Sequence, residues 1–153
     1  MTGNGAITGD LVNHGTVTCN GPLSVTGAVT NNGTMRLTGG AALSVSGGLI
    51  NNGTLDLMTG AQALPANFVN NGIVLDSGMV RASSVSRSGA SVTVTIQGYT
   101  GHSYRLERSP SLSSPDWIAL GTALTPSINN QTLTFTDSAA SGTESFYRIL
   151  VTP

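Results

Sequence analysis

The chain has 153 residues and a mass of 15.5 kDa, a length that allows one ordinary domain or two small ones. Only 8% of its residues are charged, against roughly 25% in typical globular domains, so its surface must consist largely of uncharged polar groups. The net charge is −1, all six basic residues are Arg, and no run of like charge forms a patch, which argues against nucleic acid as a partner because phosphates are held mainly by Arg and Lys. No apolar stretch reaches the roughly 20 residues that a membrane-spanning helix needs.

The start of the chain, MTGNGAITGD, lacks the basic residues and the apolar run of a secretory signal. We therefore expect either a cytoplasmic chain or a processed or excised piece. We favour the piece, because the repeat pattern described below is already present at residues 2–5. The abundance of Thr, Ser and Asn without Lys favours an extracellular location. The single cysteine, Cys19, excludes an internal disulfide and a cysteine-based zinc site within one chain.

An Asn-Asn-Gly triplet, or a close variant of it, recurs through the first half of the chain. Its first Asn stands at positions 13, 31, 51 and 70, so the intervals are 18, 20 and 19 residues, a period typical of a solenoid. Short pieces that alternate apolar and polar residues separate the triplets, and alternation with a period of two predicts strands. These pieces are 16–19, 34–37, 54–57, 73–76, 23–25, 43–45 and the weaker 64–66. We predict a short parallel β-solenoid of about four coils of 18–20 residues, stacked about 4.8 Å apart.

The alternation also assigns side chains to the inside or the outside of the coils. Two inward columns should form the core, and Asp76 falls in the second column, where we place the end of the solenoid. The columns are Val17, Met35, Leu55 and Val74, and Cys19, Leu37 and Leu57. Outward columns consist of Thr16, Thr34 and Thr54, and of Thr18, Arg36 and Asp56. We expect Arg36 and Asp56 to form a surface ion pair between coils, worth about 0.2–1 kcal/mol.

The triplets are predicted to occupy the corners of the coils. Asn and Gly both tolerate left-handed backbone angles, which suit a corner. Stacked Asn amides can also hydrogen-bond from one coil to the next. We therefore predict a structural ladder formed by Asn13, Asn31, Asn51 and Asn70. The second Asn of the triplet, as at Asn32 and Asn52, is expected to be laddered as well.

The second half of the chain lacks the triplet and holds six of the seven aromatic residues. Alternating runs joined by turn-rich loops predict a small antiparallel β-sandwich. The runs are 92–97, 103–107, 117–120, 132–136 and 145–151. We thus expect an all-β chain with a solenoid domain at 1–78 and a β-sandwich domain at 79–153.

Both halves have a family resemblance. The repeat NNGTMRLTGGAALSVSGGLINNGTLDL resembles the β-strand repeats, of autotransporter-associated type, in passenger regions of secreted bacterial surface proteins. The second half, with its Tyr-x-Leu-x-x-Ser, Trp, Phe-x-Asp and Phe-Tyr-Arg landmarks, is similar to a small β-domain that ends secreted proteins of Verrucomicrobia-like bacteria. The resemblances cover most of the chain. They imply a structural role at a bacterial surface or outside the cell, and they bring no catalytic residues.

Catalysis finds little support in the sequence. Polysaccharide lyases also use parallel β-helices, but they need clustered carboxylates, often with calcium, and an Arg or Lys. The carboxylates of the repeat half, Asp10, Asp56 and Asp76, fall in different columns, and Arg36 is its only basic residue. We predict no enzyme activity, no catalytic residue, no cofactor and no metal site.

Three other reactive side chains have structural explanations. His14 replaces an Asn of its column and is expected to be a corner residue, while His102 is expected at the surface. Cys19 is predicted to lie in the core, where a thiol is not activated as a nucleophile.

Two binding functions remain as alternatives. A flat array of Thr side chains can order water as ice-binding faces do, although Arg36 and Asp56 would place charge in this array. In the second half, Trp117, Tyr99 and Tyr104 could form a stacking platform for a carbohydrate, although a sandwich core would use the same residues.

We expect a non-catalytic extracellular structural module, whose solenoid is a spacer or a filament segment. A solenoid end exposes unpaired backbone groups and can template another chain. Since nothing before Thr2 looks like a cap, the first coil should meet either upstream coils of a longer chain or another subunit, which gives head-to-tail self-association. A surface polysaccharide is the alternative partner.

Overall fold

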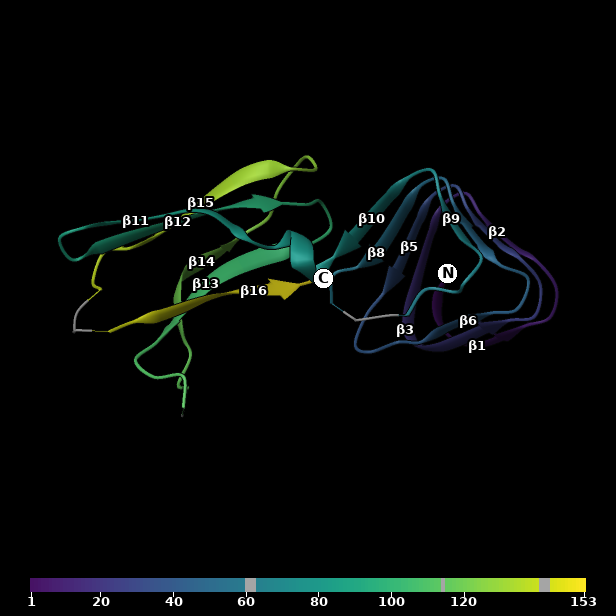
Figure 1. Cartoon of the computed structure of the whole chain (residues 1–153), viewed down its shortest axis with the longest axis horizontal. Helices are drawn as coiled ribbons and strands as arrows, with labels where there is room; N and C mark the ends of the chain where they lie inside the picture. The colour runs from purple at the N-terminus through teal and green to yellow at the C-terminus, as the bar shows by residue number, and fades with distance from the viewer. Residues whose placement is uncertain (60–62, 114, 141–143) are drawn as a thin grey trace. The chain divides into compact units, whose positions relative to one another are not determined.

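The computed structural model describes residues 1–59, 63–113, 115–140 and 144–153. It is all-β, with a parallel solenoid of about four coils over residues 2–76 followed by two small antiparallel sheets, so the predicted fold class is confirmed (Figure 1). The chain divides into two compact units, Met1–Ser77 and Gly78–Pro153. Each unit is described by itself.

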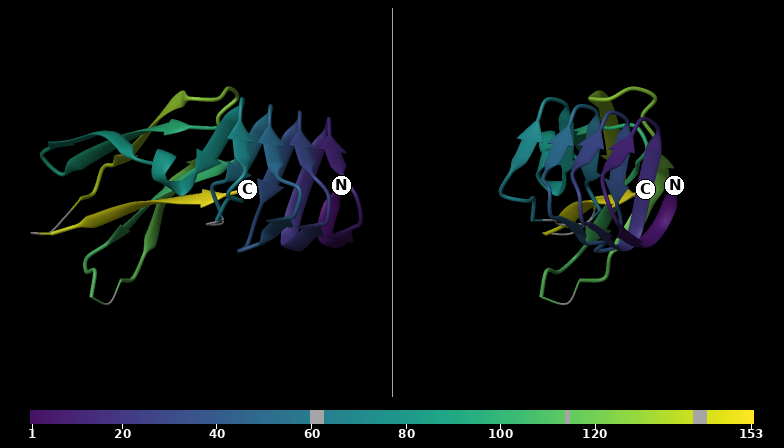
Figure 2. Two further views of the ribbon diagram at one scale, coloured as in Figure 1. Left: turned by 45° about the vertical axis from the view of Figure 1, so that its right-hand side comes forward. Right: turned by 90° about the vertical axis from the view of Figure 1, so that its right-hand side faces the viewer.

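Two parallel sheets run along the solenoid, and Figure 2 shows their strands stacked coil by coil. The four-stranded sheet has the order β2 (Leu11–Asn13), β4 (Val29–Asn31), β7 (Leu49–Asn51) and β9 (Phe68–Asn70). The six-stranded sheet has the order β1 (Thr2–Ile7), β3 (Thr16–Val25), β5 (Thr34–Leu37), β8 (Thr54–Leu57) and β10 (Ile73–Asp76), with β6 (Leu43–Val45) also paired to β3. Equivalent positions of successive coils stand opposite one another, as Asn13 does to Asn31.

The strands of the solenoid differ from the predicted pieces in four places. The strands of the four-stranded sheet, which end at the first Asn of each triplet, were not among those pieces. β3 is continuous where two pieces were predicted, because its first part pairs with β5 and its last part with β6. The predicted piece 64–66 is not a strand. Proline has no N–H to give to a ladder, and the carbonyl of Pro65 instead accepts the N–H of Phe68 in a turn. A strand before the first triplet, β1, pairs in parallel with β3.

The predicted core columns face the inside of the solenoid. Their buried members are Val17, Met35, Leu55, Cys19, Leu37 and Leu57. Val74 stands opposite Leu55 and is half-buried, packed against the same cluster. The second column ends with Asp76 opposite Leu57, which places a charged residue where the apolar column stops.

The short 3-10 helix η1 (Ser77–Met79) spans the boundary of the two units. The second unit contains two three-stranded sheets. One sheet is β11 (Ala82–Ser88), β12 (Ser91–Gly98) and β15 (Gln131–Asp137), and the other is β14 (Ile118–Leu124), β13 (Ser103–Ser109) and β16 (Phe146–Thr152). Strand β11 was not predicted, because its sequence ASSVSRS is mostly polar and all its residues are exposed. It forms through antiparallel pairing with β12, whose alternate residues are buried.

Candidate functional site

The four predicted ladder residues lie one above another, because each is the last residue of its strand and the strands are in register. Nδ2 of each of the first three residues donates to Oδ1 in the next coil, from Asn13 to Asn31 at 2.7 Å, from Asn31 to Asn51 at 2.7 Å and from Asn51 to Asn70 at 2.8 Å. The same three donors also reach backbone carbonyl oxygens, those of Thr34, Thr54 and Ile73, at 3.0, 2.9 and 3.0 Å. Asn31 and Asn51 have no exposed surface. Because buried amides need partners, this inner ladder satisfies each residue only when its neighbouring coils are present.

The second position of the triplet forms an outer ladder, as predicted for Asn32 and Asn52. Asn52 donates to Asn32 at 2.8 Å, and Asn71 donates to Asn52 at 2.9 Å. His14 holds the same position in the first coil and is exposed, as are the three Asn residues. The signal was present in the sequence, since the second Asn repeats with the same period as the first.

The glycine of the triplet permits close approach of the coils. A Cβ atom at Gly33 would overlap the carbonyl oxygen of Gly15, and a Cβ at Gly53 or Gly72 would overlap the glycine carbonyl of the preceding coil in the same way. Gly15 has nothing within 4 Å of its Cβ position. None of these four glycines has a positive φ, so the explanation of the corner by left-handed backbone angles was wrong. At Gly33, Gly53 and Gly72, glycine is required because the carbonyl oxygen of the preceding coil occupies the space that a Cβ atom would need.

The first strands of the two solenoid sheets have one open side each. In the part of the chain that the structure describes, β1 pairs only with β3, and β2 pairs only with β4. The sequence of β1, TGNGAI, has no charged residue and no proline, which are two of the devices that protect sheet edges from pairing with another chain. Strand β2 ends at Asn13, and the corner at Gly15 follows two residues later.

Arg36 and Asp56 form the predicted pair between coils, with 2.7 Å between Nε and Oδ2. The expectation of a surface pair was wrong for Asp56, whose side chain is 1% exposed. Its other oxygen accepts the backbone N–H of Met58 at 3.2 Å. Because a buried carboxylate without its cation is strongly destabilising, this pair contributes more to the stack than the surface estimate suggested.

The three reactive side chains are divided between the two units. Cys19 is buried in the solenoid core, and burial raises the pKa of its thiol, which disfavours the nucleophilic thiolate. His102 was expected at the surface, but it is buried in the second unit with its ring edge-to-face to Tyr104 at 6.4 Å between centroids. His14 lies in the first unit, so the two histidines belong to different units.

The aromatic residues proposed as a platform have different environments. Tyr104 is fully buried, and its hydroxyl oxygen accepts the backbone N–H of Tyr99 at 2.9 Å. It belongs to the core, so a platform that includes it is not formed. Trp117 is partly exposed, and the guanidinium of Arg148 lies 4.4 Å from the centroid of its ring. Tyr99 is partly exposed as well, so two aromatic residues of the proposed platform remain partly accessible, and Trp117 lies beside a cation.

Two carboxylates of the second unit are held in ion pairs. Glu107 contacts Arg105 at 3.1 Å and Arg148 at 2.7 Å. Burial opposes ionisation of Glu107, but the two guanidinium groups outweigh it and lower the pKa. These contacts lie within the sheet of β13 and β16 and fasten its strands together.

Asp137 of β15 contacts Arg108 of β13 at 2.7 Å and accepts the Tyr147 hydroxyl of β16 at 2.9 Å. Burial again opposes ionisation, but the N–H of Ala139, the Tyr147 hydroxyl and Arg108 together hold the pKa of Asp137 below its ordinary value. This cluster joins the two sheets of the second unit.

The described residues contain no group of three or more His, Cys, Asp or Glu side chains that could hold a metal ion. Within the same part of the chain, no helix is long and apolar enough to cross a membrane. Comparisons with protein-family models, with curated proteins and with solved structures found no match. The structure shows a β-solenoid of about four turns followed by small antiparallel sheets, and the comparisons identify no family.

Proposed function

We propose that this chain is a non-catalytic structural module, a spacer or filament segment of a bacterial surface or extracellular structure, which associates head to tail through the ends of its solenoid. The observation that supports the proposal best is the buried inner ladder, in which Asn31 and Asn51 each bond to the coil before and the coil after. The resemblance of the repeat to passenger regions of secreted bacterial surface proteins is consistent with that location.

The coil geometry suits a spacer. Each coil is paired to its neighbours through backbone hydrogen bonds in two sheets and through the Asn amides. The free energy of unfolding of the stack is therefore approximately the sum of the contributions of the coils and of the interfaces between adjacent coils. Length can then be added one coil at a time without a new core design. The solenoid itself holds a single basic residue, Arg36, which is paired with Asp56, so its surface consists mainly of uncharged polar groups.

The open side of the first coil offers the contacts that a coil of a second copy would need. Oδ1 of Asn13 accepts the N–H of Gly15 at 3.1 Å, and a carbonyl-type oxygen has a second lone pair for the amide of an incoming coil. Gly15 leaves room for the carbonyl of that coil, as Gly33 does for the carbonyl of Gly15. Strand β2 supplies the unpaired backbone groups.

Gly15→Ala tests the proposal, because the added methyl meets no atom of the folded chain but would overlap the carbonyl of a coil stacked in front in the same register. Ser24→Ala is the matched control, since Ser24 is exposed on β3 and pairs on both sides within the chain. Size-exclusion chromatography with light scattering at several concentrations, together with electron microscopy, would measure association.

We expect the wild type and Ser24→Ala to associate with rising concentration, and Gly15→Ala to stay monomeric with an unchanged unfolding temperature. A wild type that is monomeric at every concentration would contradict self-association. So would a Gly15→Ala chain that associates as well as the wild type, because it would show that the contact does not use this corner.

A carbohydrate-binding role is the second candidate, favoured by the accessible ring of Trp117 beside Arg148. A glycan array with wild type and Trp117→Ala would test it, with circular dichroism as the folding control. Loss of glycan binding by a folded variant would support this role, and absence of binding by the wild type would reject it.

A further inference from the structure

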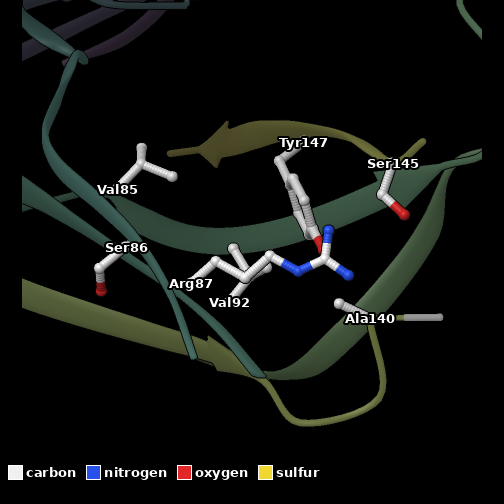
Figure 3. A pocket seen from close by; sticks show the side chains of 7 residues that line it. All are labelled: Val85, Ser86, Arg87, Val92, Ala140, Ser145 and Tyr147. Atoms are coloured by element: carbon white, nitrogen blue, oxygen red, sulfur yellow. The ribbon is translucent and has the colours of Figure 1, made fainter. Parts of the chain in front are cut away.

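A hollow of about 300 Å³ lies in the second unit between strands β11 and β16. Its lining includes Val85, Arg87, Val92, Ala140, Ser145 and Tyr147 (Figure 3). In the described chain, β11 pairs only with β12, and β16 pairs only with β13. The hollow therefore lies where the two sheets each end in an edge strand.

The walls of the hollow are mostly apolar. Val92 and Ala140 are 6% and 4% exposed and form its buried floor, whereas Val85 is 63% exposed although it lines the same space. The hydroxyl of Tyr147 is engaged by Asp137 at 2.9 Å, so Tyr147 offers the face and edge of its ring. An apolar wall that stays open to water in a folded unit is a feature of ligand sites.

One cation faces this wall. Nε of Arg87 donates to the carbonyl oxygen of Gly89 at 3.1 Å, which fixes the guanidinium group, and Figure 3 shows that group pointing toward Tyr147 across the hollow. No described carboxylate forms an ion pair with Arg87, and this includes the exposed Glu144 beside Ser145. Asp137 behind Tyr147 is already neutralised by Arg108 at 2.7 Å. The terminal nitrogens of Arg87 are thus available to an anion.

We propose that the hollow binds a small carboxylate that carries a compact apolar ring. The carboxylate would take the planar fork of Arg87, which matches its two oxygens. The ring would lie against Val85, Val92 and Tyr147, where ring edge and ring face contacts add to apolar burial. One Arg among apolar walls suits a monoanion better than a phosphate, which is usually held by several donors and charges. A volume of about 300 Å³ is at the lower end of known ligand sites.

Phenylacetate is the probe that tests this proposal, added to the full chain and followed by nuclear magnetic resonance of the methyl groups of Val85, Val92 and Ala140. We expect saturable shifts at these methyls with a Kd on the order of 1 mM, as suits a ligand of about ten non-hydrogen atoms. Phenylacetamide keeps the ring and removes the charge, and glucuronate keeps the carboxylate on a polar ring. Both should bind at least about tenfold more weakly, because each lacks one of the two contacts.

Arg87→Gln should weaken phenylacetate binding by at least about tenfold. Arg81→Gln is the matched control, because Arg81 is also exposed and its Nε also donates to a backbone carbonyl, that of Gly78 at 2.7 Å. Thermal unfolding would establish that both variants fold. The proposal is overturned if phenylacetate shifts none of the three methyls, if phenylacetamide binds equally well, or if Arg87→Gln binds as the wild type does. Equal binding of glucuronate would overturn the assignment of an apolar ring.

Discussion

Replacing Asn31 by Ala should be among the most destabilising single changes in the solenoid. Asn31 is fully buried and makes three side-chain hydrogen bonds, because it accepts from Asn13 and donates to Asn51 and to the carbonyl of Thr54. At about 1 kcal/mol net for each bond, the loss is about 3 kcal/mol. The orphaned Oδ1 of Asn51 lies in a residue with no exposed surface, which adds to the cost.

Asn32→Ala is the matched control for this prediction. Asn32 is the next residue, its side chain also bonds to the following coil, at 2.8 Å from Asn52, but it is exposed to solvent, so its loss should change stability by no more than about 0.5 kcal/mol. Urea unfolding followed by circular dichroism would give the free energies. Hydrogen exchange of peptides from β4 and β7 would localise the effect, since opening can be local. Equal losses in the two variants would refute the view that the buried ladder stabilises the stack.

Three further measurements test other contacts. Gly53→Ala should destabilise the solenoid by more than about 2 kcal/mol, since its methyl would overlap the carbonyl of the coil in front, and Gly15→Ala should leave the free energy of unfolding nearly unchanged. Cys19 should react with a thiol reagent only when the solenoid opens, so that labelling is far slower in native than in unfolded protein, and fast native labelling would contradict its burial. The lowered pKa of Asp137 means that its ion pair stabilises the second unit above the ordinary value of 3.8 and is lost as the pH falls through the lowered pKa. The urea midpoint from Trp117 fluorescence should therefore fall on acidification, and it should fall less in Asp137→Asn.

The solenoid was predictable because its constraints repeat. Residues that serve the same corner recur at intervals of 18–20, so a single period assigned the columns, the inner ladder and the Arg36–Asp56 pair. Burial was harder to predict, since alternation placed Asp56 outside and the structure buries it. The reason for the glycines was also not readable from one coil, because it depends on the carbonyl of a neighbouring coil.

The second unit was less predictable because its contacts do not repeat. Strand β11 has few apolar residues and forms through its partner β12, which local sequence cannot show. His102 and Tyr104 were placed by tertiary packing. The hollow beside Arg87 was missed for the same reason, since β11 and β16 lie far apart in the sequence. Arg87 in the polar strand β11 does not by itself indicate a binding site, because the apolar residues that complete the hollow come from other segments of the chain.

The inner ladder also gives the solenoid a direction. Each Nδ2 lies between two acceptors, the next Asn Oδ1 and a backbone carbonyl, as for Asn13 with Asn31 and Thr34, so the amide orientation is fixed by its surroundings. Within the inner ladder the donors of Asn13, Asn31 and Asn51 therefore point toward the C-terminal coil, whereas the donors of the outer ladder, on Asn52 and Asn71, point toward the N-terminal coil. For the inner ladder, the first coil presents the acceptor Oδ1 of Asn13. Two copies that met through their first coils would bring acceptor against acceptor. A coil that stacks on Asn13 must approach with its donors first, which makes head-to-tail the only direction in which the ladder continues.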